Sequence, residues 1–336
     1  MSVIKVNNLT KTFYTFSRRE GITGAIKDLF RRDYRELVAV DHISFEVQEG
    51  ELLGYIGPNG AGKSTSIKML TGILKPTSGE MEVLGYHPFN QRQNYTRHIG
   101  VVFGQRTQLW WDIAVVESFK LLAKIYDVPE KEYKLKIKEL SEILDLAPLL
   151  NTPVRKLSLG QRIRCDLAAS LLHSPSILFL DEPTIGLDAV GKDSIRTFLR
   201  EINANTGTTI ILTTHDLKEI EELCKRIIII DHGKLIYDGG LDRVKNLPGL
   251  KREISIDFSG DISAKELNNL FGGRIEFKQE SERHLYASFS PAEITAVEIL
   301  TSIVGKYPVA DVSIAEPDIE EVVMKIYREG ITGHAA

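Results

Sequence analysis

The chain has 336 residues, 43% hydrophobic and 26% charged, and a net charge of −4. This composition is typical of a globular protein with room for one large domain and a small one, and the negative charge argues against a nucleic-acid partner held by bulk charge. The most apolar short run, Ile227–Ile230, is far too short to cross a bilayer, and no long apolar run opens the chain. Cys165 and Cys224 lack metal-type spacing and fit a reducing compartment. We therefore expect a cytoplasmic protein that can work beside a membrane.

Short strands come first in the chain, followed by helices and then by alternation of the two. The pattern predicts early strands at Val3–Val6, Ile43–Val47, Leu52–Ile56, Glu80–Leu84 and Ile99–Phe103. Apolar residues recur at helical spacing from about residue 114 to 150, which predicts a helical subdomain at about residues 106–172. Further strands are expected at Ile177–Leu180, Thr209–Thr213 and Ile227–Ile230, with helices at Val190–Asn203 and Leu217–Lys225. This order favours an α/β fold with a largely parallel sheet.

The character of the chain changes after about Asn246, where residues 247–252 are typical of a linker. The elements expected beyond it are a strand, a helix, two strands, a helix and a strand, at Glu253–Phe258, Ala264–Leu270, Arg274–Lys278, His284–Phe289, Ala292–Val304 and Val309–Ala315. This βαββαβ order is typical of a small α+β ferredoxin-like domain, which we place at residues 247–336. A last helix is expected from Pro317 to Tyr327. Because this region holds no cluster of catalytic type, we expect a regulatory or docking role.

A glycine-rich segment between the strand Leu52–Ile56 and a helix at Ser64–Leu70 has the pattern of a phosphate-binding loop. Glycines let the backbone curl so that N–H groups point at a polyphosphate, and the helix start adds free donors and the positive end of its dipole. Lys63 would reach the terminal phosphates, and the Ser64 hydroxyl would bind Mg²⁺. The predicted nucleotide contacts are Gly57, Pro58, Asn59, Gly60, Ala61, Gly62, Lys63, Ser64 and Thr65.

Two carboxylates, Asp181 and Glu182, end the strand Ile177–Leu180. Because ligands collect at the carboxyl ends of strands in parallel sheets, Asp181 would lie beside the phosphate-binding loop and hold Mg²⁺ through water. Glu182 would face the γ-phosphate and accept a proton from an attacking water. Without the loop, the same pair would be interpreted as acids that face solvent.

Four further motifs resemble those of one protein family. The family signature LSGGQ is similar to Leu157-Ser158-Leu159-Gly160-Gln161, its Q-loop glutamine to Gln105, its D-loop to Gly186-Leu187-Asp188 and its switch histidine to His215. Together with the two phosphate-site motifs they stand in the family's order, so over Met1 to about Lys245 the chain resembles the nucleotide-binding subunit of an ATP-binding cassette (ABC) transporter. The resemblance implies, at residues 1–246, a P-loop ABC cassette with a RecA-like core, an antiparallel β subdomain and a helical subdomain.

The resemblance also implies a site shared between two subunits. In this family, two subunits pair head to tail around two ATP molecules, so Ser158, Gly160 and Gln161 of one subunit would contact the ATP held by Lys63 of the other. An anion can approach a helix N-terminus that carries small residues. Leu159 departs from the signature's glycine; it keeps the backbone N–H but excludes a positive φ.

Other roles are implied in the same way. Gln105 would contact Mg²⁺ and the attacking water, and would sense the helical subdomain. His215 would hydrogen-bond the γ-phosphate, and Asp188 would link the two sites across the dimer. Members of the family stack an aromatic residue on the adenine after the first strand, where Phe13 fits the spacing better and Tyr14 is its neighbour. Core packing is the alternative for Phe13.

The segment at about residues 15–37 is longer than in an ordinary member and carries Arg18, Arg19, Lys27, Arg31, Arg32 and Arg35. Its apolar residues fall on one helical face, so we predict an amphipathic basic helix at Ile22–Phe30. Such a helix suits a membrane interface or a groove of a partner. A surface helix packed on its own domain is the alternative.

Trp110 and Trp111 follow Gln105 closely. Two adjacent side chains of a regular element cannot both be buried on one face. We expect one of them to face a partner, because tryptophan is favoured at interface hot spots and this region of the family adjoins the groove for the membrane subunit. Packing of both in the core is the alternative.

Residues 100–117 and 182–188 look most like ABC-2-type exporter ATPases, including drug and viologen exporters. The resemblance therefore implies an ATPase, with ATP and Mg²⁺, on the inner face of the cell membrane. It would pair with an identical or paralogous ATPase subunit and drive a separate ABC-2-type permease. A soluble ABC ATPase acting on ribosomes or DNA is the alternative, although a single cassette without a coiled coil argues against it. Glu182 and His215 argue against a non-hydrolysing regulatory module.

Overall fold

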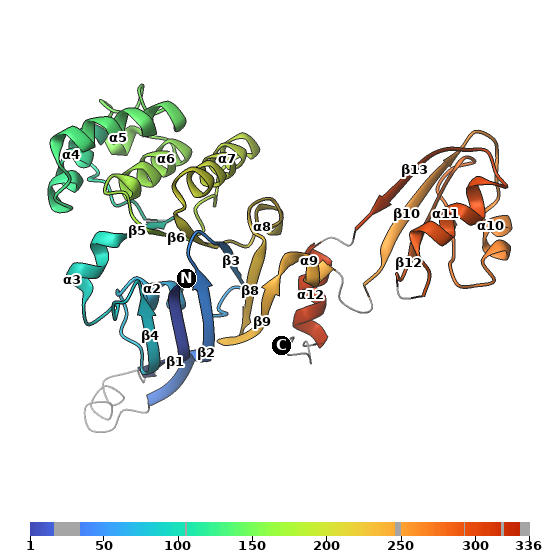
Figure 1. The fold of residues 1–336 in the computed structure, drawn as a ribbon, viewed down its shortest axis with the longest axis horizontal. Coiled ribbons are helices and arrows are strands. Elements are labelled where there is room, and N and C mark those ends of the chain that lie inside the picture. Colours follow the sequence, from blue (N-terminus) through green and yellow to red (C-terminus); the bar gives the residue numbers. More distant parts are fainter. Residues whose placement is uncertain (17–33, 105, 246–249, 292, 317–318, 330–336) are drawn as a thin grey trace, which may run out of the picture. The chain divides into compact units, whose positions relative to one another are not determined.

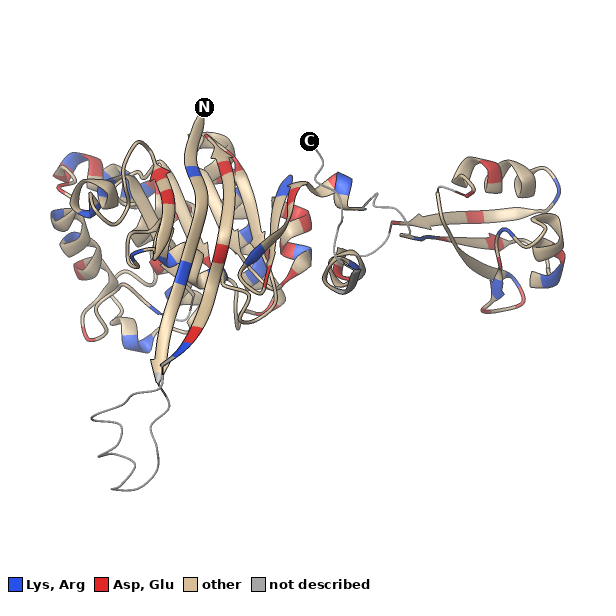
Figure 2. Ribbon diagram, turned by 90° about the horizontal axis from the view of Figure 1, so that it is seen from below, with Lys and Arg blue, Asp and Glu red and all other residues tan. Residues whose placement is uncertain are grey.

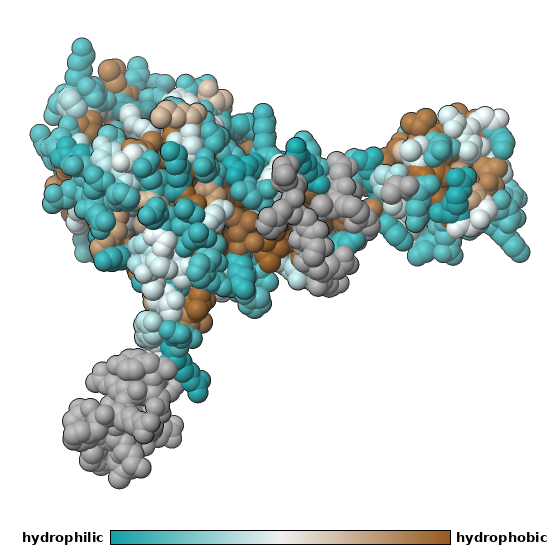
Figure 3. Space-filling view, turned by 60° about the horizontal axis from the view of Figure 1, so that its bottom comes forward, coloured by the Kyte–Doolittle hydropathy of each residue, from teal (hydrophilic) through white to brown (hydrophobic). Residues whose placement is uncertain are grey.

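The computed structural model describes residues 1–16, 34–104, 106–245, 250–291, 293–316 and 319–329. The chain divides into two compact units, Met1–Gly239, here called the cassette, and Gly240–Ala336, the C-terminal unit. Among the described residues, no helix is both long and apolar enough to span a membrane. The face of the cassette seen in Figure 3 is mostly hydrophilic, with scattered hydrophobic side chains.

A six-stranded sheet lies at the centre of the cassette (Figure 1). Its order is β5-β6-β7-β3-β8-β9, and the pairs from β5 to β8 are parallel. The strands are β3 (Leu52–Ile56), β5 (Ile99–Phe103), β6 (Ile177–Asp181), β7 (Thr209–Thr213), β8 (Arg226–Asp231) and β9 (Lys234–Gly240). The helices that follow β3, β6 and β7 are α2 (Lys63–Leu70), α7 (Ala189–Thr206) and α8 (Leu217–Leu223). The predicted α/β class and largely parallel sheet are confirmed, whereas β9 had not been predicted.

A second, antiparallel sheet packs beside the first. It contains β1 (Ser2–Phe16), β2 (Tyr34–Gln48) and β4 (Ser78–Val83), in the order β2-β1-β4. Residues of both sheets share one core, to which β1 contributes Ile4 and β3 contributes Tyr55. The predicted strands Val3–Val6 and Ile43–Val47 are too short. Cross-strand pairing continues through polar residues that an apolar pattern does not reveal, and the register shifts along the pair mark bulges.

Three helices form the helical subdomain: α4 (Val115–Ile125), α5 (Glu130–Ile143) and α6 (Leu159–Leu171). They lie together at one end of the cassette (Figure 1). The short α3 (Arg92–Tyr95) and the 3₁₀ turns η1 (Thr96–His98) and η2 (Val154–Lys156) complete the cassette's helices within the described residues. Trp110 and Trp111, in the loop before α4, are 42% and 49% exposed, so packing of both in the core is wrong.

The C-terminal unit has its own sheet, in the order β11-β12-β10-β13, with each neighbouring pair antiparallel. Its elements are α9 (Leu241–Lys245), β10 (Arg252–Phe258), α10 (Ala264–Leu270), β11 (Lys278–Gln279), β12 (His284–Phe289), α11 (Ala296–Val304), β13 (Val309–Ala315) and α12 (Ile319–Glu329). A separate apolar core joins β10, β12, α10 and α11. From β10 to β13 the elements follow the βαββαβ order, and the ferredoxin-like assignment stays a prediction.

Two boundaries in this unit differ from the prediction for local reasons. The strand expected at Arg274–Lys278 shrinks to β11, because the Asn268 side chain takes both the N–H and the carbonyl of Phe277. The helix expected from Ala292 begins at Ala296, because Thr295 and Glu298 form a capping box. The predicted helix Ile22–Phe30 and half of the predicted linker, residues 247–249, lie outside the described residues. The flanks of the insertion, at Thr15 and Arg35, pair as strand.

Candidate active site

The predicted phosphate-binding loop connects the buried strand β3 to α2. Gly60 and Gly62 have φ of 83° and 107°, a region that side chains rarely adopt. A side chain at Gly62 would also collide with the carbonyl oxygen of Ala39 in β2, so the turn into α2 requires glycine. Of the other predicted contacts, Ala61 is buried, Gly57 and Thr65 are half-buried, and Pro58 and Asn59 are exposed.

Lys63 begins α2 and is only 6% exposed. Its ammonium donates hydrogen bonds to the carbonyl oxygens of Gly57, at 2.6 Å, and Pro58, at 3.1 Å. Burial lowers the pKa of Lys63, while the nearby carboxylates of Glu182 and Asp181 raise it. The loop therefore holds a desolvated cation at the positive end of a helix, which is an arrangement that attracts phosphate.

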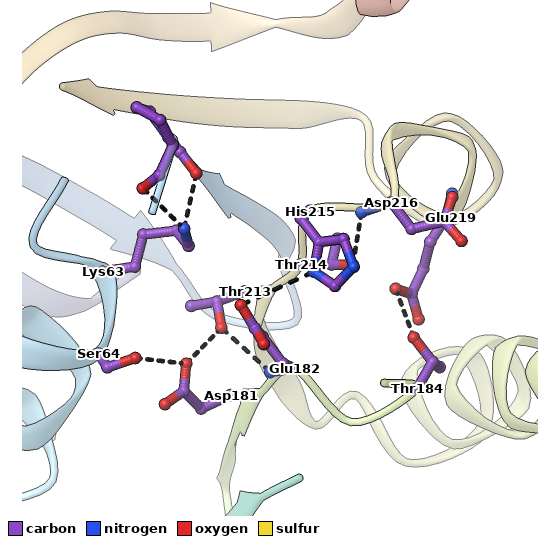
Figure 4. A network of polar contacts seen from close by, with 12 residues as sticks. Lys63, Ser64, Asp181, Glu182, Thr184, Thr213, Thr214, His215, Asp216 and Glu219 are labelled. Carbon is purple, nitrogen blue, oxygen red and sulfur yellow. Dashed lines mark hydrogen bonds and ion pairs between the residues drawn. The ribbon is translucent and has the colours of Figure 1, made fainter. Parts of the chain in front are cut away.

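Ser64, Asp181 and Thr213 meet beside this lysine, at the ends of α2, β6 and β7 (Figure 4). The hydroxyls of Ser64, at 3.2 Å, and of Thr213, at 2.6 Å, both donate to Asp181 Oδ1. Parallel pairing of Asp181 with Thr213 brings them to the same sheet edge. A hydroxyl and a carboxylate are the hard oxygen ligands that Mg²⁺ prefers, and one or two such groups suffice when phosphates complete the shell. The residues present fit this ion.

Glu182 and His215 lie next to each other beyond the same strand ends (Figure 4). His215 Nδ1 is 3.8 Å from Glu182 Oε1, and the two side chains are 58% and 22% exposed. Glu182 has φ of 54°, an uncommon conformation for a residue with a side chain. Its backbone N–H is shared between the carbonyl and hydroxyl oxygens of Thr213, at 3.0 and 3.2 Å. Such local strain is typical of a residue held in place for function.

A cavity of about 470 Å³ opens beside Glu182, and this volume suits a small-molecule ligand. It is lined by residues that include Asn59, Ser64, Asp181 and Glu182. Gln105 lies outside the described residues, but its neighbours Gly104 and Arg106 line this cavity. Five predicted site residues from two elements and two loops are thus brought to one edge of the sheet: Lys63, Ser64, Asp181, Glu182 and His215.

The signature residues lie elsewhere. Ser158 caps α6: its hydroxyl accepts the Gln161 N–H at 3.2 Å, and the Gln161 side chain accepts the Ser158 N–H at 2.9 Å. Asp188 caps α7 by accepting the Gly191 N–H at 2.7 Å. Both ends, with Gly160, line a second cavity of about 560 Å³, which shares no lining residue with the first. A single chain therefore does not bring the signature to Lys63.

Leu159 is the first residue of α6, so its backbone is helical and needs no positive φ. Its side chain lies against the D-loop: a Cβ on Gly186, where φ is 74°, would approach Leu159 Cδ2 to 2.8 Å. The departure from the signature's glycine thus adds a contact between signature and D-loop.

The aromatic candidates for adenine lie side by side in β1, opposite Leu37 and Glu36 of β2. Phe13 is half-buried, with the Lys11 ammonium 5.2 Å from its ring centroid. Tyr14 is 60% exposed, and a hydrogen bond to Glu36 raises its pKa. The adenine contact by Phe13, with Tyr14 as its neighbour, stays a prediction.

Asp166, in α6, is a site residue that the sequence reasoning missed. It is 4% exposed, and its Oδ1 accepts the Thr107 hydroxyl, at 2.9 Å, and the Gln108 N–H, at 3.0 Å. The Gln108 side chain also donates to the Asp166 carbonyl at 2.9 Å. Asp166 therefore ties the segment after Gln105 to the signature helix. An acid between the apolar residues Cys165 and Leu167 was the signal that could have revealed it.

The charge of Asp166 predicts a pH-dependent stability. Burial raises its pKa from 3.8 to about 6, so stability is lost as the pH rises through 6 and the buried carboxylate ionises. Asp166→Asn keeps the acceptor oxygen without the charge. We expect it to be more stable than the parent at pH 8 by on the order of 2 kcal/mol, a gain that shrinks towards pH 4. Denaturant unfolding between pH 4 and 8 measures this; a difference that does not change with pH would contradict it.

Known proteins are similar to this chain over most of its length. Residues 40–185 match the ABC transporter family. Daunorubicin resistance ATP-binding protein DrrA3 of Streptomyces coeruleorubidus is 31% identical over 312 residues, which cover 90% of this chain and 96% of that protein. Bacitracin transport ATP-binding protein BcrA of Bacillus licheniformis is 36% identical over 63% of this chain and 68% of its own length. Two other relatives are longer: the matched region spans 19% of human ATP-binding cassette sub-family A member 6 and 37% of Escherichia coli YbhF.

Solved structures are also similar to this chain. The dimeric ABC transporter cassette MJ0796, in a post-hydrolysis state with ADP and Pi, is 26% identical, with a TM-score of 0.58 over 71% of this chain and 98% of that one. The cbiO1 protein of a Clostridium perfringens ABC transporter complex is 27% identical, with a TM-score of 0.59 over 72% of this chain and 90% of that one. The chain belongs to the family of ABC transporter ATP-binding proteins.

Proposed function

We propose that this protein is the ATP-hydrolysing subunit of an ABC exporter. Convergence of Lys63, Ser64, Asp181, Glu182 and His215 at one sheet edge carries the proposal. The loop N–H groups and Lys63 bind the phosphates of ATP, and Ser64 and Asp181 would hold Mg²⁺, which would neutralise phosphate charge. Glu182 accepts the proton of the water that attacks the γ-phosphorus, while the bond to the β-phosphate oxygen breaks and ADP leaves. His215 donates a hydrogen bond to the γ-phosphate, and Gln105 would orient the water.

The active form would be a head-to-tail pair of ATPase subunits. Because the signature and the phosphate-binding loop line separate cavities, ATP on one chain needs Ser158 and Gly160 of another. The Ser158 hydroxyl accepts one hydrogen bond as helix cap, and its own proton is available for a phosphate oxygen. Gly160 presents an N–H group of the first turn of α6, whereas the Gln161 N–H is bonded to the Ser158 hydroxyl. The second subunit is either identical or a close paralogue.

Export through a separate ABC-2-type permease is supported by the relatives. DrrA3, a resistance protein, matches nearly the full chain, whereas methionine import protein MetN of Geobacillus kaustophilus matches 70% of it. The exposed Trp110 and Trp111 suit a protein partner. We place the protein in the cytoplasm, on the inner face of the membrane, and leave the predicted Ile22–Phe30 helix as a candidate membrane contact.

A nucleic-acid target is disfavoured. Figure 2 shows acidic and basic residues interspersed along the described ribbon, and the chain is net negative. Binding to DNA or RNA backbones would favour a basic stripe.

Affinity purification from detergent-solubilised membranes tests the proposal. We expect a polytopic membrane protein to co-purify and the complex to hydrolyse ATP in the presence of Mg²⁺. Recovery of ribosomes or DNA in place of a membrane protein, or a complex without ATPase activity, would contradict the proposal.

A further inference from the structure

Glu182 and His215 lie just beyond the ends of the neighbouring strands β6 and β7, in two separate turns. Glu182 follows Asp181, the last residue of β6, and leads through Pro183 to Thr184, while His215 leads through Asp216 into α8. A shift of either turn would change the 3.8 Å separation of the two side chains. Because a displacement of 1 Å can cost about 10²-fold in rate, something must fix the two turns to one another.

A buried hydrogen bond does this. Thr184 Oγ1 donates to Glu219 Oε2 at 3.0 Å, and the two residues are 3% and 1% exposed. Glu219 lies in the first turn of α8, and its N–H donates to the Asp216 cap at 3.4 Å. Figure 4 shows Thr184 and Glu219 near Glu182 and His215, with Glu219 on α8 and Thr184 in the turn after β6.

The bond is also costly to break. A carboxylate in so dry a place costs free energy unless its oxygens are paired, and burial accordingly raises the pKa of Glu219. Losing the Thr184 hydroxyl would leave a buried acceptor unsatisfied. The neighbouring bridge from Lys192 to Asp216, at 2.6 Å, is 31% and 22% exposed and therefore contributes less.

We propose that Thr184 and Glu219 form a positioning pair that holds the Glu182 and His215 turns in register for hydrolysis. Neither Thr184 nor Glu219 lines the cavity beside Glu182, so the pair acts through the residues on either side. This inference rests on the proposed ATPase function.

Steady-state kinetics of the full chain with Mg²⁺ and ATP test the pair. Thr184→Val keeps the shape and removes the donor, and Glu219→Leu removes the acceptor. For both we expect kcat to fall by about tenfold while KM stays within about twofold, because the phosphate-binding loop is untouched. Thr184→Ser and Glu219→Gln keep the donor and the acceptor, so each should retain kcat within about threefold of the parent.

Thr209→Val is the matched control. Thr209 is 1% exposed at the opposite end of β7, where its hydroxyl accepts the Gly50 N–H at 2.9 Å. Like Thr184→Val, Thr209→Val removes one hydrogen bond made by a buried hydroxyl, and we expect a drop in melting temperature with the parental kcat. Thermal unfolding of all variants distinguishes a loss of stability from a loss of kcat. If Thr184→Val does not fold, the kcat of Glu219→Leu tests the pair.

The outcomes are distinct. A parent that hydrolyses ATP, with Thr184→Val or Glu219→Leu at the parental kcat, overturns the positioning pair alone. An equal fall in kcat for Thr184→Val and Thr209→Val would also overturn the positioning pair. The same holds if Thr184→Ser or Glu219→Gln lowers kcat as much as Thr184→Val and Glu219→Leu do. A parent without ATPase activity contradicts the proposed function, and the inference falls with it.

Discussion

Glu182→Gln is expected to lose ATP hydrolysis by about 10²–10³-fold while it still binds ATP. The amide has the shape of the carboxylate but cannot accept the proton of the attacking water. Lys63, Ser64 and Asp181, the residues proposed to hold the phosphates and the ion, are unchanged. Phosphate release measures the rate, and a fluorescent ATP analogue measures binding.

A second readout of this variant is its molar mass. Because hydrolysis would normally open the dimer, ATP-bound pairs of Glu182→Gln should accumulate, and light scattering should show a shift from the 37.7 kDa of one chain to about twice that value. Glu117→Gln, which removes a carboxylate from an exposed ion pair with Lys120, is the control and should hydrolyse ATP at the parental rate. Hydrolysis by Glu182→Gln at that same rate would show that Glu182 is not the base.

Gly104→Ala should reduce hydrolysis by roughly 10²-fold, although a single methyl group is added. A Cβ at Gly104 would collide with the carbonyl oxygen of Glu182, and its N–H is bonded to Asp181 at 2.9 Å. Either the segment leading to Gln105 or the Glu182 turn must move, and both line the cavity. The overpacking should also cost about 1–3 kcal/mol of folding free energy.

Gly305→Ala is the matched control, because no atom lies within 4 Å of a Cβ there. It should leave both rate and stability at the parental values. Steady-state rates and denaturant unfolding of the two alanine variants check the prediction. Parental activity in Gly104→Ala would mean that the close approach of Gly104 to Glu182 is not needed for hydrolysis.

The elements that the sequence predicted well are those whose signal is local. The phosphate-binding loop is one contiguous segment, so its glycines, Lys63 and Ser64 could be assigned from spacing. The strands β3, β5 and β7 were predicted with the bounds observed, because each is a short apolar run between turn residues.

What could not be predicted depends on pairs far apart in the chain. Asp181 with Thr213, Asp166 with Thr107, and Thr184 with Glu219 are separated by 32, 59 and 35 residues. Only the order of strands brings such residues together, and no spacing rule encodes it. The long pairing of β1 with β2 has the same origin. The prediction that the signature of one subunit contacts the ATP of another came from the family resemblance. The structure adds that, within one chain, the signature and the phosphate-binding loop line separate cavities.

Mixing two inactive variants tests most directly whether each site is completed by a second chain. Lys63→Met removes the ammonium group that should bind the phosphates. Gly160→Asp brings a negative charge to the N-terminus of α6, which should meet the triphosphate. The new side chain has room, because only Leu187 Cδ2 lies within 4 Å of a Cβ at this position. Each alone should be inactive. A head-to-tail pair of one of each has one intact site, so the mixture should regain up to about a quarter of the parental ATPase rate. A mixture as inactive as its components would contradict the account.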